Sequence, residues 1–351
     1  MSNLDAYCDA LVHETADYRH GELTIDRAHA RRWVDQFAEN EREFVAWQTA
    51  EIMKHWYATR ADMQRLPTTL AESTSFTGGK PPAEFWKAAN VLALQERGSS
   101  QAEVLTVFDQ VLAKTYGFRI ADCGSSDGPC VYVDDCIFSG TQVRNDLRRW
   151  IEEKDIRGRK IIVVTLGCHA GGLWHIESKL TDVLAPRGNS LDFFAAVTIE
   201  DRKSKLNQCE VLHPTLPDPA DPLIDGFAKI LEAKGHPPAW RPSNAKLPKG
   251  FASEDARSAY ERIMLRKGIE LRALSASPSD SMKPLGYTRL WTFGFGGLFT
   301  TYRNCANNAP LAWWWGDPGA DHGPLSKWYP LLPRKRPELS IVEMFRGLGL
   351  R

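Results

Sequence analysis

The stretch PCVYVDDCIFSGTQV, residues 129–143, predicts both how this chain folds and where it binds a ligand. Residues 131–133, VYV, are a short β-branched and aromatic run that is typical of a strand. Two adjacent acids, Asp134 and Asp135, follow it, and Ser139-Gly140-Thr141 comes shortly afterwards. We expect a strand, a turn with paired carboxylates and a loop that cradles an anion.

The next segments indicate a parallel sheet. Apolar residues recur at helical spacing from Val143 to Ile151, and IIVV at 161–164 is a continuously apolar strand. A second helix is expected over 170–181 and another apolar strand, FFAAVTI, over 193–199. Short strands without alternation, separated by helices, are typical of a parallel sheet that is covered on both faces. The predicted class is therefore α/β.

The rest of the chain reads as additions to this sheet. Helical periodicity is seen at about 24–60, 101–115, 224–235 and 254–272, and the stretch from Pro284 is rich in Trp, Gly and Pro. Within it, WTFGFGGLFTTYRN looks like strands around a glycine turn. We divide the chain into an N-terminal helical region 1–65, an α/β domain 66–334 with a helical insertion at about 221–275, and a C-terminal tail 335–351.

Composition excludes several classes of protein. Formal net charge is zero, so no global field attracts nucleic acid or anionic lipid. We see no secretory signal and no apolar run of about 18 residues, so we expect no membrane segment. The seven cysteines are scattered and odd in number, which favours a reduced, cytoplasmic protein.

The chemistry of the central stretch points to a sugar phosphate. Open α/β sheets bind ligands beyond the carboxyl ends of their strands, where Asp134 and Asp135 stand. Their carboxylates suit sugar hydroxyls or a hard cation held through water. Gly140 allows close approach of the backbone, and the helix that follows offers its N–H groups to a phosphate. A ribose 5-phosphate fits this spacing.

This string resembles the type I phosphoribosyltransferases, in which an apolar strand, two acids and a Thr/Ser-Gly loop recur. Asp134 and Asp135 match the acids that contact the ribose hydroxyls of phosphoribosyl pyrophosphate. Ser139, Gly140, Thr141 and Gln142 match the loop around the 5-phosphate, although Gln142 stands where the family usually has Thr or Ser. The resemblance implies a phosphoribosyltransferase-type parallel sheet, wrapped by N-terminal helices and a Trp-rich C-terminal extension.

Three segments, DDCIFSGTQ (134–142), TYRNCANNAP (301–310) and WYPLLPR (328–334), resemble one group more than type I phosphoribosyltransferases in general. This group is the phosphoribosyltransferase-like family of bacterial conflict (anti-phage defence) systems. That resemblance covers about 40–334. It implies a pentosyltransferase that binds phosphoribosyl pyrophosphate or a nucleotide, with Mg²⁺ carried by the ligand near Asp134 and Asp135. It also implies a role as a defence effector or accessory with a partner protein, and a fold that often forms homodimers.

Two further parts of such a site have candidates. A loop gripping pyrophosphate could be formed by Gly78, Gly79 and Lys80, although GGK is also common in surface loops. Asn307 and Asn308 could contact the acceptor, because amides both donate and accept hydrogen bonds. Asn pairs are also favoured in turns.

Other functions remain open. The same fold could sense a nucleotide without catalysis, since no basic active-site loop is evident. Direct nucleic-acid binding is not expected, because acids interrupt the basic run at 144–160. VVTLGCHAGG at 163–172 resembles a metacaspase nucleophile with Cys168, but no histidine lies between His55 and Cys168 to act as its upstream base. The sequence contains no Cys-x-x-Cys pair, so we do not expect a structural zinc site.

Overall fold

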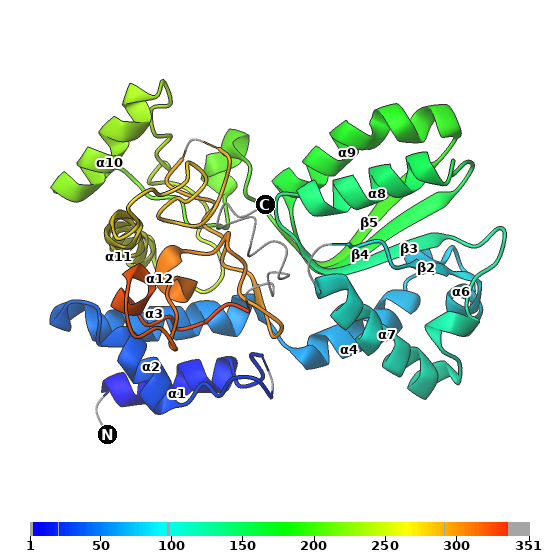
Figure 1. Cartoon of the computed structure of the whole chain (residues 1–351), viewed down its shortest axis with the longest axis horizontal. Coiled ribbons are helices and arrows are strands. Elements are labelled where there is room, and N and C mark those ends of the chain that lie inside the picture. The colour runs from blue at the N-terminus through cyan, green and yellow to red at the C-terminus, as the bar shows by residue number, and fades with distance from the viewer. Residues whose placement is uncertain (1–2, 20, 97–98, 291, 336–351) are drawn as a thin grey trace, which may run out of the picture.

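The computed structural model describes residues 3–19, 21–96, 99–290 and 292–335, which form two lobes side by side (Figure 1). One lobe is built on a four-stranded sheet, and the other consists of helices and irregular segments. The second lobe is built mainly from residues before 57 and after 200, whereas the helices at 60–116 pack on the sheet.

The sheet has the strand order β2-β3-β4-β5, and every pairing is parallel. Its strands are β2 (Asn90–Leu92), β3 (Cys130–Ile137), β4 (Lys160–His169) and β5 (Ser190–Ile199). In this register Ile137 pairs with Cys168, and His169 pairs with Ile199. The α/β class with a parallel sheet is thus confirmed. Because all strands run the same way, their carboxyl ends share one edge, which faces the second lobe (Figure 1).

Helices cover both faces of the sheet. Two lie on one face, namely α8 (Thr141–Glu153) and α9 (Ala170–Leu184), and they pack on each other. On the other face lie α4 (Arg60–Ala71), α5 (Thr74–Thr77), α6 (Pro82–Ala88) and α7 (Ser100–Tyr116). The apolar stripe of α8 is buried against the sheet at Val143, Leu147 and Ile151, as its spacing predicts.

The second lobe joins the two ends of the described chain. Its helices are α1 (Asn3–Glu14), α2 (Arg27–Val34), α3 (Glu39–Trp56), α10 (Pro222–Ala233), α11 (Glu254–Ala273) and α12 (Leu311–Trp314). The indole of Trp33 on α2 donates to the carbonyl of Ala312 (2.8 Å), and that of Trp313 donates to the hydroxyl of Tyr260 (2.9 Å). The Trp-rich C-terminal extension is therefore core rather than surface.

Short elements complete the fold. A two-residue strand β1 (Tyr57–Ala58) pairs in parallel with β6 (Thr300–Thr301) at the junction of the lobes. The 3₁₀ turns are η1 (Ile120–Asp122), η2 (Ala185–Arg187), η3 (Lys203–Gln208) and η4 (Pro324–Lys327). A buried charge network lies beside α11, where Glu261 accepts from Arg257 (3.0 Å) and Arg241 (2.9 Å).

Several sequence predictions need correction. The helix expected over 24–60 is divided into α2 and α3, with a break at 35–38. The strands expected in WTFGFGGLFTTYRN reduce to Thr300–Thr301, because Gly294 and Gly296 adopt positive φ values of 154° and 74° that interrupt an extended chain. The proposed domain boundaries stay predictions, and residues 336–351 of the predicted tail lie outside the described residues.

Candidate functional site

Asp134 and Asp135 lie inside β3 rather than in a turn after it. The strand continues to Ile137, and consecutive strand residues point to opposite faces. Asp134 is therefore buried, with 5% of its surface exposed, whereas Asp135 is partly exposed. The sequence correctly placed the acids near a carboxyl end. It did not predict that they face different neighbours.

Asp134 is held in a site that favours its protonated form. Its carboxyl accepts the backbone N–H of Asp135 (2.9 Å) and contacts the side chain of Ser100. Burial, with a smaller contribution from the negative charge of Asp135, raises the pKa of Asp134 to about 8. At neutral pH this carboxyl is therefore a hydrogen-bond donor as well as an acceptor.

Asp135 is engaged by the other lobe. One of its oxygens accepts the N–H of Cys136 (2.8 Å). The other accepts the hydroxyl of Thr301 and the Nε–H of Arg303, each at 3.1 Å. The Nη1 group of Arg303 also lies 3.3 Å from a carboxylate oxygen of Glu103 on α7. Asp135 is thus a carboxylate whose partner is a guanidinium of the second lobe.

The predicted phosphate loop is formed as a sharp turn between β3 and α8. Gly140, at its centre, has φ +72°, and a Cβ there would lie 2.4 Å from the carbonyl oxygen of Gly172. A Cβ on Gly172 would likewise lie 2.1 Å from the carbonyl oxygen of Phe138. Larger residues at either glycine would push the loop away from α9. The loop therefore depends on both glycines, and only one of them was singled out from the sequence.

The start of α8 provides donors for an anion. The N–H of Thr141 has only a long contact to the hydroxyl oxygen of Ser139 (3.5 Å), and the N–H groups at 142 and 143 begin the helix without an intrahelical acceptor. The side chain of Gln142 points inward, since its amide donates to both oxygens of the buried Asp146 at 2.9 Å. Gln142 can therefore serve a phosphate through its backbone only.

A second helix terminus lies beside the acids. The helix α7 begins at Ser100, a few residues after β2 ends, and the Ser99 hydroxyl is 3.5 Å from the Nη1 of Arg303. This repeats the order strand, polar loop and helix that surrounds Asp134. The sequence NVLALQERGSS (90–100) contains this order of strand, polar loop and helix start, but β2 has only three residues and gives no recognisable strand pattern. The N-termini of α7 and α8 thus flank the carboxyl end of β3.

The loop at 78–80 is not brought to this edge by any described contact. Gly78 ends α5 with φ +65°, and the N–H of Lys80 donates to the carbonyl of Thr77 (3.4 Å). Within the described ranges, no hydrogen bond or ion pair connects 78–80 with 139–142. The next helix, α6, lies at the end of the sheet away from the second lobe (Figure 1).

The asparagine pair holds a turn together. The side-chain amide of Asn308 donates to the backbone carbonyl of Tyr287 (2.8 Å). The backbone carbonyl of Asn308 accepts the N–H of Gly297 (3.1 Å). The carbonyl of Asn307 accepts the N–H of Tyr287 (2.7 Å). These contacts give Asn308 a structural role, and they assign no ligand to either residue.

A segment of the second lobe covers part of the carboxyl edge. We call residues 293–303 the covering segment. Its Phe299 ring lies so close to Gly167 of β4 that a Cβ there would be 2.6 Å from the ring. Its Phe295 ring meets the edge of His169 at 4.9 Å between centroids. Burial lowers the pKa of His169 to about 4, so this imidazole is neutral.

Cys168 does not have the surroundings of a nucleophile. It is 1% exposed, and its sulfur lies 3.4 Å from the hydroxyl of Thr198. Burial raises the pKa of the thiol, which disfavours the thiolate. The neighbouring His169 points to the opposite face of the strand and contacts the carbonyl of Ile137 through Nδ1 (3.0 Å). These contacts weigh against the protease interpretation.

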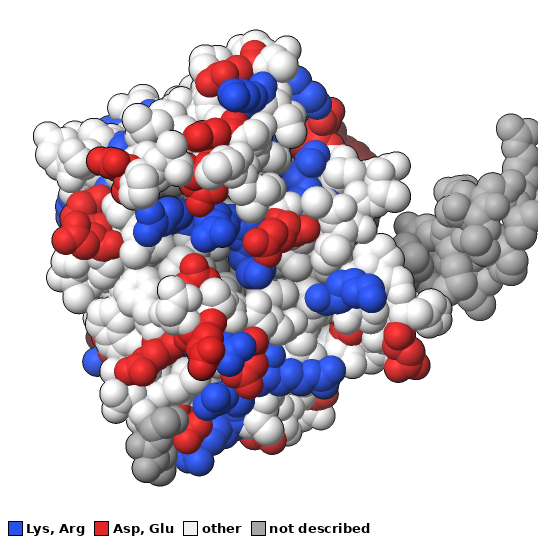
Figure 2. Space-filling model, turned by 90° about the vertical axis from the view of Figure 1, so that its left-hand side faces the viewer, with Lys and Arg blue, Asp and Glu red and all other residues white. Residues whose placement is uncertain are grey.

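The basic residues of α8 are paired rather than presented. Arg148 forms ion pairs with Glu152 (3.2 Å) and Asp182 (2.7 Å). Arg149 lies 2.9 Å from Glu96 and 3.5 Å from Asp146. On the face of the helical lobe drawn in Figure 2, basic and acidic side chains also alternate. Such mixed charge offers little to a nucleic-acid backbone.

The structure describes residues 3–19, 21–96, 99–290 and 292–335. Within them, no group of three or more His, Cys, Asp or Glu side chains is placed to hold a metal ion. None of the described helices has the length and apolar character needed to cross a membrane. All seven cysteines are free thiols.

Comparison with known proteins assigns the chain to a family. A family model described as PRTase-CE matches residues 30–334, which is most of the chain. No curated protein and no solved structure matches.

Proposed function

Because the chain belongs to the PRTase-CE family of phosphoribosyltransferase-like proteins, we propose that it binds phosphoribosyl pyrophosphate or a related nucleotide at the carboxyl end of β3. The supporting observation is the pair of helix N-termini, those of α7 and α8, on either side of Asp134 and Asp135. Phosphoribosyl pyrophosphate carries an anionic group on each side of a ribose. Helix N-termini are suited to bind such groups.

We assign the 5-phosphate and the pyrophosphate of phosphoribosyl pyrophosphate to different segments. The loop 139–142 holds the 5-phosphate through backbone N–H groups and the hydroxyls of Ser139 and Thr141. The start of α7, with the hydroxyls of Ser99 and Ser100, holds the pyrophosphate. We favour this terminus over Gly78, Gly79 and Lys80, because α7 follows the strand adjacent to β3.

The two acids have different tasks. Asp135 is an acceptor for a ribose hydroxyl, and Asp134, whose pKa burial raises to about 8, can donate to one hydroxyl and accept from another. We propose that Mg²⁺ arrives on the ligand's phosphates and lies near Asp134 and Asp135 without being bound directly by them. Bound there, Mg²⁺ would offset the negative charge of the pyrophosphate.

The corresponding reaction is pentosyl transfer. The bond from C1 of the ribose to the pyrophosphate oxygen breaks, and the pyrophosphate leaves with the electron pair. A bond from C1 to the acceptor's nucleophilic atom forms, and the acceptor's proton passes to solvent. The protein contributes position, since both ends of the ribose are fixed before reaction. We propose Asn307 and Asn308 as residues that contact the acceptor. The side chain of Asn307 is the stronger candidate, because that of Asn308 already donates to the carbonyl of Tyr287.

A sensor is the second candidate function. Two observations favour it. The guanidinium of Arg303 already donates to Asp135, and the covering segment packs on the carboxyl edge of the sheet. A ligand that must displace such contacts could report its presence by moving them. The wording of the motifs at 134–142, 301–310 and 328–334 supports a place in an anti-phage defence system, with a partner protein and a homodimer as the expected assembly.

Calorimetry of Mg²⁺ with phosphoribosyl pyrophosphate tests the site. Asp135→Asn should weaken binding by about tenfold or more, as expected when a hydrogen bond from a ribose hydroxyl to this side chain is lost. Asp192→Asn is the matched control, because this exposed carboxylate on β5 pairs with Lys160 near the amino end of the sheet. Absence of binding by the wild type, or equal affinity in Asp135→Asn, would refute the proposal.

A second assay separates enzyme from sensor. The protein is incubated with labelled phosphoribosyl pyrophosphate and candidate nucleobases, and released pyrophosphate is measured. Release that requires Asp135 identifies a transferase. Tight binding without release identifies the sensor. Binding to RNA or DNA that falls steeply with salt would favour the nucleic-acid alternative instead.

A further inference from the structure

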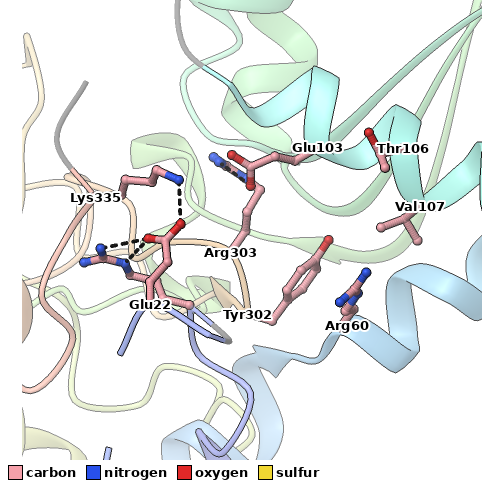
Figure 3. A pocket seen from close by; sticks show the side chains of 9 residues that line it. Glu22, Arg60, Glu103, Thr106, Val107, Tyr302, Arg303 and Lys335 are labelled. Carbon is pink, nitrogen blue, oxygen red and sulfur yellow. Dashed lines mark hydrogen bonds and ion pairs between the residues drawn. The ribbon is translucent and has the colours of Figure 1, made fainter. Parts of the chain in front are cut away.

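A charged pocket of about 230 Å³ lies between the lobes, next to the proposed ribose site (Figure 3). It is lined from distant parts of the chain, including the turn after α1, the starts of α4 and α7, and the end of the covering segment. Four of its lining residues are cationic and two are anionic: Arg19, Arg60, Arg303 and Lys335 against Glu22 and Glu103. The lining is therefore net positive.

The cations differ in how well they are paired. Glu22 accepts from both Arg19 (2.9 Å) and Lys335 (2.7 Å), so these two cations share one carboxylate. Arg303 is shared between Glu103 and Asp135. Arg60 forms no ion pair with any described residue, and its Nε–H is buried without an acceptor. The structure thus leaves one guanidinium in need of an anion.

A second donor in the pocket is also unsatisfied. Tyr302 is 8% exposed, and its hydroxyl is buried without a hydrogen-bond partner. In Figure 3 this hydroxyl points toward the space between Arg60, Glu103 and Val107. Burial raises the pKa of Tyr302 to about 12, so the hydroxyl retains its proton and can donate. Buried polar groups are nearly always paired, and two orphaned donors in one pocket indicate a missing acceptor.

Arg303 connects this pocket to the ribose site. Its Nε donates to Asp135 (3.1 Å), and its Nη1 donates to Glu103 at the wall of the pocket (3.3 Å). An anion in the pocket would compete with Asp135 for the guanidinium. Movement of Arg303 toward that anion would free Asp135 to accept a ribose hydroxyl.

We propose that this pocket binds a small carboxylate- or phosphate-bearing molecule through Arg60, Tyr302 and Arg303, and that the bound anion strengthens binding of the ribose ligand. The anion site stands on the pocket alone, whereas the coupling rests on the proposed function. Linkage makes the effect reciprocal, so the ribose ligand strengthens anion binding by the same factor. The volume is below the usual range of roughly 300–1,000 Å³, which limits the occupant to a small molecule or to one acidic group of a larger one.

Calorimetric titration with inorganic phosphate and with malonate tests the anion site and distinguishes the two chemistries. Arg60→Gln should weaken binding of at least one anion by about tenfold, because a charge-assisted hydrogen bond is lost. Arg65→Gln is the control on the same helix, since Arg65 is exposed and lies outside the pocket. Tyr302→Phe gives a second variant, which removes a buried hydroxyl without a partner and leaves the ring in place.

The phosphate and malonate arms have distinct outcomes. Weakening of phosphate alone assigns a phosphate occupant, and weakening of malonate alone assigns a carboxylate. Equal binding of both anions in Arg60→Gln and Tyr302→Phe would overturn the site.

Coupling is measured by titrating Mg²⁺ and phosphoribosyl pyrophosphate with and without saturating malonate. Wild-type affinity should rise by about fivefold, within the usual range of coupling between sites, and Arg60→Gln should abolish the increase. Affinity that malonate leaves unchanged or lowers would overturn the coupling. Failure of phosphoribosyl pyrophosphate to bind at all would refute the proposed function, and the anion titrations would still decide the pocket.

Discussion

Replacing Asp134 by Asn should remove a pH-dependent loss of stability that is specific to this carboxyl. The side chain is buried and its pKa is raised to about 8, whereas an unfolded chain has the ordinary value of 3.8. Between these two values the folded protein holds a proton that the unfolded chain has released. Stability of the wild type therefore falls as pH rises from about 4 to about 8, and the loss is complete above the folded pKa.

The size of the effect follows from linkage. One fully linked proton changes the free energy of unfolding by about 1.4 kcal/mol per pH unit. From about pH 5.5 to about pH 7.5 the stability of Asp134→Asn relative to the wild type should rise by roughly 2–3 kcal/mol. The comparison between variants is needed because His169 and His213, whose pKa values burial lowers to about 4, act with the opposite sign. Their contribution is common to both proteins.

Urea unfolding at several pH values gives the required free energies. Asp192→Asn serves as control, because its carboxylate lies at the surface and keeps its water when the protein folds. The difference between Asp192→Asn and the wild type should change little with pH. A flat difference between Asp134→Asn and the wild type over the same interval would refute the assignment of a protonated Asp134 at neutral pH.

Three further changes have definite expected outcomes. Gly140→Ala should destabilise the protein by about 2 kcal/mol or more in urea unfolding and weaken phosphoribosyl pyrophosphate binding, because of its φ of +72° and the carbonyl of Gly172 at 2.4 Å; an unchanged midpoint would contradict this. Glu261→Ala should destabilise it by about 3–5 kcal/mol, since two buried guanidinium groups lose their shared carboxylate; a loss below about 1 kcal/mol would argue that the network relaxes. Cys168→Ala should leave ligand binding within about twofold, well under 1 kcal/mol, and an activity lost in Cys168→Ala but retained in Asp135→Asn would revive the protease interpretation.

The sequence by itself determined the local parts of the site. The strand–loop–helix order at 129–143 follows from short-range preferences, because β-branched residues favour the strand and Gly140 permits the left-handed turn. The periodicity of α8 and the continuously apolar strands fixed a parallel sheet in the same way. Ser253 stands just before α11, and its hydroxyl caps that helix by accepting the N–H of Ala256 (3.1 Å), as the local preference of serine for this position would indicate.

Only the tertiary structure decided what each acid meets. Asp134 is buried against Ser100 at the start of α7, and Asp135 is bound by Arg303, which is 168 residues away in the chain. No local pattern records such a contact, because it depends on how the second lobe folds back over the sheet. TYRN at 301–304 was noted as a motif, but its guanidinium had no assigned partner. The charged pocket likewise depends on the tertiary structure, because its lining residues come from segments that are far apart in the sequence.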